Sequence, residues 1–172
     1  RVANTVLAYD PQGECVARYD KIHLFRFDNG SERYDEAAVL KAGELPVTFA
    51  CTTRDGAELT VGLSVCYDLR FPELYRLLKA DLILVPAAFT HTTGQAHWEV
   101  LLRARAIENQ AYVLASAQGG EHTNGRRTWG QSMAIDPWGN VLAQQAVGEG
   151  VVVADVDLTL LRRVRTDLPA LQ

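Results

Sequence analysis

The sequence contains little cysteine, no long apolar run and no excess of positive charge. Its three cysteines, Cys15, Cys51 and Cys66, are odd in number and widely spaced, which argues against a disulfide framework and a structural zinc cluster. The net charge of −4 gives no general attraction to nucleic acid or an anionic membrane. Apolar stretches such as residues 82–89 are far shorter than the roughly 18 residues of a membrane span. We therefore expect no nucleic-acid or membrane partner and a reducing, cytoplasmic setting.

The remaining composition is that of a globular protein, with 172 residues that are 48% hydrophobic and 22% charged. We expect residues 1–172 to form one domain. Helical spacing predicts helices over residues 71–79 and 97–110, and fading periodicity predicts a long irregular excursion over 21–43. Apolar runs bounded by turn residues predict strands over 2–8, 14–19, 46–53, 59–65, 81–89, 112–117, 132–136, 140–144 and 150–157. Because strands and helices interleave, the predicted class is α/β with a mixed sheet.

Cys66 lies in the stretch VGLSVCYDLRFPELYRLLK, where a predicted strand meets a predicted helix. A thiol nucleophile must lose its proton, and a free cysteine with a pKa of about 8.5 is mostly protonated at neutral pH. A histidine, a lysine or a carboxylate held close to the thiol would meet this need. Among the histidines, His97 is the best placed by sequence. The other interpretation is a buried, inert thiol, because free cysteines often behave as small apolar residues.

Three charged residues have positions that suggest chemistry. Lys21, in YDKIHLF, lies where a predicted strand meets the long excursion, and Glu36 follows in that excursion. Arg70 comes four residues after Cys66, on the first predicted helical turn, where a guanidinium can bind a carboxylate in a bidentate manner. Each also has an ordinary interpretation. Lys21 and Glu36 would be solvent-exposed side chains, and Arg70 would form a structural salt bridge.

Four segments together resemble the nitrilase superfamily of carbon–nitrogen hydrolases, and within it the Nit branch. They are YDKIHLF, VCYDLRFPE, AHWEVLLRARAIENQAYV and GQSMAIDPWGNVLA. The resemblance extends from the turn at Asp10 to LRRVRTDLP near the end of the sequence. It implies an αββα sandwich that works without metal or cofactor and carries a Glu-Lys-Cys triad.

The resemblance also implies catalytic roles for individual residues. Cys66 matches the nucleophile, Lys21 the triad lysine and Glu36 a second, supporting glutamate. Cys66 would attack an amide carbonyl, while the Lys21 ammonium and the backbone N–H of Tyr67 stabilise the oxyanion. Expulsion of ammonia would leave a thioester that water hydrolyses. This chemistry needs no histidine, so His97 becomes a structural residue at a helix start.

Further positions match the family's substrate pocket. Arg70 would bind the carboxylate of an α-keto acid, and Phe89 and Thr93 would line the same pocket. The alternatives are that Phe89 is only a core residue and that Thr93 is only a loop hydroxyl. Glu99, of the HWE sequence, would order the site or form a buried helix salt bridge. The polar loop over residues 118–127 would shape selectivity for a peptide-like tail.

The triad glutamate of the family lies before the segment that corresponds to Arg1, so we expect this chain to lack roughly the N-terminal third of the domain. The resemblance implies an amidase for a small-molecule amide, namely deaminated glutathione. The alternatives are an ω-amidase for α-keto acid amides and a non-catalytic interaction module of the same fold. It also implies a homodimer or higher homo-oligomer, packed through the helices predicted over residues 71–79 and 97–110.

Overall fold

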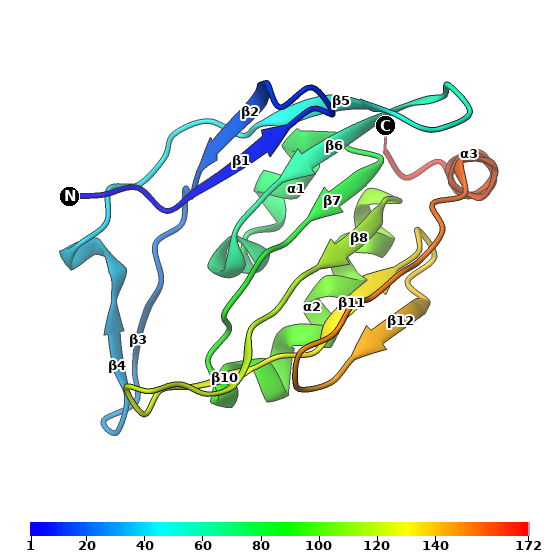
Figure 1. The fold of residues 1–172 in the computed structure, drawn as a ribbon. Coiled ribbons are helices and arrows are strands. Elements are labelled where there is room, and N and C mark those ends of the chain that lie inside the picture. The colour runs from blue at the N-terminus through cyan, green and yellow to red at the C-terminus, as the bar shows by residue number, and fades with distance from the viewer. Residues whose placement is uncertain (172) are drawn as a thin grey trace.

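The computed structural model describes residues 1–171 and is built around a mixed sheet of six strands in the order β12-β11-β8-β7-β6-β5 (Figure 1). β6, β7 and β8 run parallel to one another, whereas β5 and β11 pair antiparallel with β6 and β8 and β12 pairs antiparallel with β11. This arrangement confirms the predicted α/β class with a mixed sheet. The strands are β5 (Thr48–Thr52), β6 (Glu58–Leu63), β7 (Leu82–Leu84), β8 (Tyr112–Ala115), β11 (Ser132–Ile135) and β12 (Val141–Gln145).

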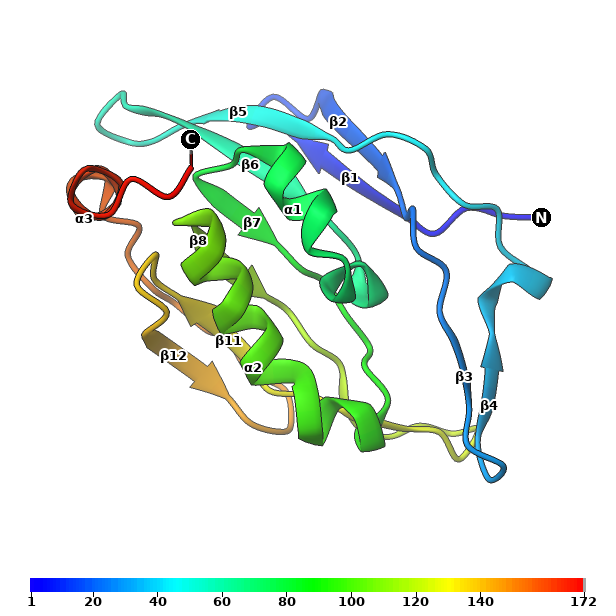
Figure 2. The ribbon, with the colours of Figure 1, turned by 180° about the vertical axis from the view of Figure 1, so that it is seen from behind.

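Two helices, α1 (Pro72–Leu78) and α2 (His91–Asn109), cover one face of the sheet (Figure 2). Apolar side chains at helical spacing, such as Leu74 and Leu78 of α1 and Trp98 and Leu102 of α2, are buried in the core between helix and sheet. No helix formed by residues 1–171 lies over the other face in Figure 1. These residues thus form one α/β layer pair of the expected αββα sandwich.

Three short hairpins surround the sheet. The predicted first hairpin is confirmed as β1 (Thr5–Tyr9) with β2 (Cys15–Asp20). The excursion over 21–43 is less irregular than predicted, because it contains β3 (Arg26–Asp28), β4 (Arg33–Asp35) and the 3-10 helix η1 (Glu36–Ala38). The polar loop after β8 likewise folds into β9 (Gly119–Glu121) and β10 (Arg127–Trp129).

The start of α2 was predicted wrongly, because the helix begins at His91 instead of His97. The segment in between contains Gly94, which favours a loop in isolation. Gly94 is needed for packing, since a Cβ built there would lie 2.3 Å from the Cβ of Trp129. A close contact between helix and hairpin therefore explains this glycine.

The strand predicted over residues 150–157 is also wrong. The alternation in this segment is real, but Val151 and Val153 are exposed and the segment forms no ladder within residues 1–171. It leads instead into α3 (Leu158–Asp167), a helix that the sequence reasoning missed. The Asp157 carboxylate begins this helix by accepting hydrogen bonds from the N–H groups of Thr159 and Leu160.

Candidate active site

Cys66 is the first residue of η2 (Cys66–Arg70), a 3-10 helix that follows the carboxyl end of β6. Ligand sites of open α/β sheets form at the carboxyl ends of the parallel strands. The Cys66 backbone has a φ of 50°, in the left-handed region that disfavours residues with a Cβ. Its N–H donates to the Pro86 carbonyl at 3.0 Å and so joins the turn to the chain that follows β7. The thiol is thus presented at the carboxyl edge of the sheet.

The buried carboxylate of Asp68 holds this turn in place. It accepts hydrogen bonds from the Val65 N–H at 2.8 Å, the Tyr19 hydroxyl at 2.7 Å and the His23 N–H at 3.1 Å. The Nδ1 of His23 lies 2.8 Å from the same carboxylate, and its ring stacks on Phe71. The sequence reasoning missed this network, whose members come from β2, from the segment after it, and from η2 with the residue on either side of it.

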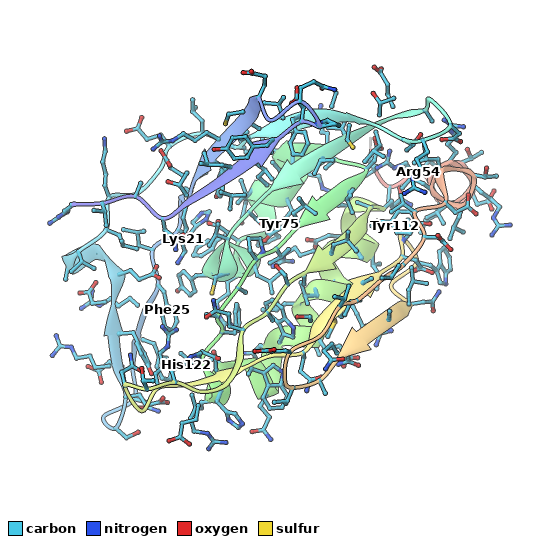
Figure 3. The ribbon with its side chains drawn as sticks, viewed as in Figure 1. Lys21, Phe25, Arg54, Tyr75, Tyr112 and His122 are labelled. Atoms are coloured by element: carbon cyan, nitrogen blue, oxygen red, sulfur yellow. The ribbon has the colours of Figure 1, made fainter. Side chains whose placement is uncertain are left out.

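Lys21 is buried, with 1% of its side chain exposed, which excludes the interpretation as a solvent-exposed lysine. Its Nζ forms an ion pair with the Glu36 carboxylate, which also accepts a hydrogen bond from the Phe25 N–H at 2.7 Å. In Figure 3, Lys21 and Phe25 lie on the side of the sheet where β6, β7 and β8 end. The structure therefore joins the predicted lysine to the predicted glutamate.

The environment of the Cys66 thiol acts on its pKa in both directions. Burial raises the pKa and is the largest effect, with a smaller upward contribution from the Glu36 carboxylate. A hydrogen bond with the Ala88 backbone and the positive charges of Lys21 and Arg126 oppose that rise. Since the pKa of the thiol stays raised, the nucleophile needs a proton acceptor when it attacks.

Two cavities meet at Cys66. The larger one, about 520 Å³, is lined by Cys66 and Glu36 together with residues from the ends of β7 and β8, including Ser116 and Gln118. The smaller one, about 20 Å³, also has the thiol in its lining. Its lining contains Glu36, Cys66, Tyr67, Arg70, Phe89, Thr93 and Arg126. Most of the predicted site residues therefore share one enclosed space.

Arg70 lies half-buried in the smaller cavity. Its guanidinium carbon is 5.4 Å from the centre of the Phe89 ring, and its Nη1 is 3.3 Å from the Nδ1 of His97. Burial lowers the pKa of Arg70. No carboxylate among residues 1–171 forms a salt bridge with it, so the guanidinium is available for an anionic group of a ligand.

Two predictions for α2 need correction. Glu99 does not join the cavities: its side chain is 51% exposed and lies 3.8 Å from Arg103, one helical turn later. Its helical position points it to solvent, so the alternative of a buried salt bridge is wrong as well. His97 lies within the helix, is exposed and contacts Arg70, which leaves it outside the immediate surroundings of the thiol.

The Tyr67 N–H and Arg126 complete the surroundings of the thiol. Within residues 1–171, no hydrogen bond uses the N–H of Tyr67, as an oxyanion donor requires, and its catalytic role stays a prediction. Arg126 comes from the β9–β10 turn and lines both cavities. The sequence reasoning named the loop that carries Arg126 but did not select this residue. No cluster suited to a metal ion is present in the described part of the chain.

Comparison with known proteins identifies the family of this chain. Residues 1–166 match the family model described as carbon-nitrogen hydrolase. The deaminated glutathione amidase of Yersinia enterocolitica is 45% identical over 99% of this chain and 60% of its own length. The crystal structure of the Caenorhabditis elegans NitFhit protein is 44% identical and superposes with a TM-score of 0.86, covering 97% of this chain and 40% of that one.

The first curated relatives are longer than this chain, which spans about 60% of their length. The amidase of Synechocystis, for example, is 44% identical over 98% of this chain and 62% of its own. None of the helices formed by residues 1–171 has the length and apolar character needed to cross a bilayer. On the family model and these identities, the chain belongs to the carbon–nitrogen hydrolase family.

Proposed function

We propose that this protein hydrolyses the amide bond of deaminated glutathione through a thioester on Cys66. The observation that carries the proposal is the shared lining of one small cavity by the Cys66 thiol, the Lys21-bound carboxylate of Glu36 and the uncompensated guanidinium of Arg70. The thiol is a nucleophile and the free guanidinium can bind a carboxylate, both in one cavity, while the buried Lys21 that pairs with the Glu36 carboxylate supplies positive charge for stabilisation.

In the proposed reaction, the Cys66 sulfur forms a bond to the amide carbon while its proton passes to a carboxylate base. The Lys21 ammonium and the Tyr67 N–H stabilise the oxyanion, and a missing donor of this kind typically slows a reaction by about 10² to 10³. The C–N bond then breaks and the nitrogen takes up the proton. It leaves as ammonia from a primary amide or as an amine from a peptide-like amide. Water hydrolyses the thioester and restores the thiol.

Arg70 and Phe89 give the proposed substrate its orientation. The Arg70 guanidinium binds the carboxylate of the α-keto acid, and the Phe89 ring packs against the guanidinium and the acyl chain. This arrangement suits the acyl part of deaminated glutathione and also that of an ω-amide of an α-keto acid. The two activities differ on the amine side of the bond, so direct comparison of the two substrates distinguishes them.

The test uses the full-length protein and measures release of the α-keto acid from deaminated glutathione and from α-ketoglutaramate. We expect turnover of both, with a higher kcat/KM for deaminated glutathione. Cys66→Ala removes the activity, whereas Cys51→Ala, which changes an exposed free cysteine, leaves it intact. A preference for α-ketoglutaramate would assign ω-amidase activity instead. No turnover of either substrate, with the fold retained, would support the non-catalytic module.

We further propose that two copies associate through the outer surface of α1 and α2 in a reducing compartment such as the cytoplasm. Leu77, Val100 and Ile107 are large apolar side chains that α1 and α2 leave exposed. The free state of all three cysteines suits a reducing compartment. Sedimentation of the full-length protein should give a dimer or larger assembly that Val100→Lys weakens, whereas a wild-type monomer would contradict the association.

A further inference from the structure

The histidine of the HWE sequence contacts the cation of the smaller cavity at Cys66. His97 lies on α2, and Arg70 is the last residue of η2. The Nη1 of Arg70 is 3.3 Å from the Nδ1 of His97, and the two residues are 27 positions apart in the sequence. Within residues 1–171, this is the hydrogen bond that holds the Arg70 guanidinium. His97 therefore has a direct influence on how the guanidinium is oriented.

The chemistry of this contact fixes the state of the histidine. A guanidinium has five N–H donors and no acceptor, so Nη1 donates and Nδ1 accepts. The His97 ring is then neutral and carries its proton on Nε2. A neutral acceptor holds the guanidinium without cancelling its charge. A carboxylate in the same place would form a salt bridge with Arg70 and compete with the carboxylate of a ligand.

Trp98, the next residue of the HWE sequence, supports the same arrangement. Its side chain is fully buried, and its Nε1 donates to the Gln131 carbonyl at 2.8 Å. The centre of its ring lies 4.9 Å from that of Phe89, whose ring centre is in turn 5.4 Å from the central carbon of the Arg70 guanidinium. Trp98 thus anchors α2, so that the contacts of Arg70 with His97 and with Phe89 both depend on this helix.

The aromatic neighbours of Arg70 confine its guanidinium, whereas the hydrogen bond gives it direction. The rings of Tyr67 and Phe89 have their centres 6.0 and 5.4 Å from the guanidinium carbon. Attraction to a ring face depends weakly on rotation of the cation, but a hydrogen bond selects one orientation. An arginine that is oriented before the ligand arrives loses less side-chain freedom on binding. The contact with His97 therefore favours binding of an anion at Arg70.

We propose that His97 is a positioning residue for substrate binding, which orients Arg70 for the carboxylate of the α-keto acid and leaves its positive charge available. The inference rests on the proposed function, because it takes Arg70 as the group that binds this carboxylate. It concerns the hold on the acyl part and not the attack by Cys66. An interaction that is equal in the ground state and the transition state acts on KM and leaves kcat nearly unchanged.

The test measures kcat and KM for α-ketoglutaramate with the full-length protein and three variants at position 97. His97→Ala should raise KM about twofold to tenfold, which is the range for one hydrogen bond, with little change in kcat. His97→Asn should restore most of the affinity, because its amide oxygen can replace Nδ1 as a neutral acceptor. His97→Asp should raise KM above the value for His97→Ala, because its carboxylate pairs with Arg70.

A neutral ligand separates positioning of Arg70 from a general effect on the fold. In levulinamide a methyl group replaces the carboxylate of α-ketoglutaramate, so its inhibition constant against α-ketoglutaramate should be the same in wild type and in all three variants. Gln95→Ala is the matched control, since it changes an exposed polar residue on the same helix and should leave both constants unchanged. Circular dichroism and the unfolding midpoint establish that each variant is folded.

Three results would overturn the inference while leaving the amidase function standing. One is a KM that His97→Ala does not change. Another is an equal weakening of α-ketoglutaramate and levulinamide, which would make the role of His97 purely structural. The third is an equal KM for His97→Asp and His97→Asn, since the acceptor would then not need to be neutral. Absence of turnover by the wild type removes the proposed function and the inference together.

Discussion

Tyr19 donates a hydrogen bond of 2.7 Å to the buried carboxylate of Asp68, across 49 positions of sequence. Tyr19 lies on β2 shortly before Lys21, and Asp68 lies on η2 shortly after Cys66. This one bond therefore connects the strand that leads into Lys21 to the 3-10 helix that carries the thiol. The distance between these two groups decides whether the ammonium can stabilise an oxyanion, so Asp68 is a positioning residue for the proposed site.

Asp68→Ala should lower the free energy of unfolding of the full-length protein by about 3 kcal/mol or more. The change leaves the Val65 N–H, the Tyr19 hydroxyl and the His23 N–H without their buried acceptor. Urea unfolding measures the loss. Asp155→Ala, at an exposed position, should stay within about 0.5 kcal/mol of wild type. Equal effects of the two substitutions would show that the hydrogen bonds to Asp68 do not stabilise the fold.

Lys21→Met and Glu36→Gln should shift the pKa of the Cys66 thiol in opposite directions. The positive charge of Lys21 lowers this pKa and the negative charge of Glu36 raises it, so their removal raises and lowers it respectively. The pH dependence of iodoacetamide alkylation, in protein carrying Cys15→Ser and Cys51→Ser, reports the pKa of the remaining thiol. Lys41→Met is the exposed control and should leave the profile in place. Shifts of the same sign would rule out this electrostatic account.

Secondary-structure elements marked by nearby residues could be predicted from the sequence alone. The alternation and turns around β1, β2, β5 and β6 and the apolar stripe of α1 predicted these elements. Resemblance to a family selected Cys66 and Lys21, which the structure places in one region. Glu99 shows the limit of a motif, because the helical position that follows the buried Trp98 points to solvent.

The features that escaped prediction depend on contacts between distant segments. Gly94 belongs to a helix only because Trp129, on a hairpin 35 positions later, occupies the space of its missing side chain. Arg126 looks like any loop arginine until Tyr34 and Ala88 fix it beside the thiol. The Tyr19–Asp68 bond likewise joins two residues whose individual signals are weak. Tertiary packing, and not local preference, decides such positions.

The stability of the protein should fall at alkaline pH. Burial raises the pKa of Cys66, Tyr19 and Tyr75, so the folded state keeps protons that the unfolded chain has lost. The stabilisation is therefore complete below the ordinary pKa values, about 8.5 for cysteine and about 10 for tyrosine, and declines as the pH rises above them. Between its pKa in the unfolded chain and its pKa in the folded protein, each group lowers the free energy of unfolding by about 1.4 kcal/mol per pH unit.

Tyr75→Phe measures the contribution of one tyrosine to this pH dependence of the free energy of unfolding. At pH 8 the variant should be less stable by about 1 kcal/mol, because Tyr75 loses its 3.0 Å hydrogen bond to the Ser64 hydroxyl. At pH 11 the difference should shrink or reverse, since the variant has no buried phenol to ionise on unfolding. Urea unfolding at a series of pH values gives both results. A constant difference across the series would contradict the assignment.

The left-handed backbone of Cys66 leads to a last prediction about glycine. At an ordinary helical position such as the exposed Ala96, replacing alanine by glycine costs about 1 kcal/mol. At position 66 the backbone has a φ of 50°, where a Cβ is itself unfavourable by about 1 kcal/mol or more. Cys66→Gly should therefore be at least as stable as Cys66→Ala, although glycine is the more flexible residue in the unfolded chain. Urea unfolding of both variants, with Ala96→Gly alongside, makes the comparison.

A Cys66→Gly variant clearly less stable than Cys66→Ala would mean that the turn is unstrained. The expected result instead means that the fold accepts a local cost to place a side chain at this position. The cost is borne by the Asp68 network and by the hydrogen bond from the Cys66 N–H to Pro86, which together hold the turn in this conformation. Strain at a residue with no reactive group would be a liability, whereas at Cys66 it directs the thiol into the cavities that contain Glu36 and Arg126.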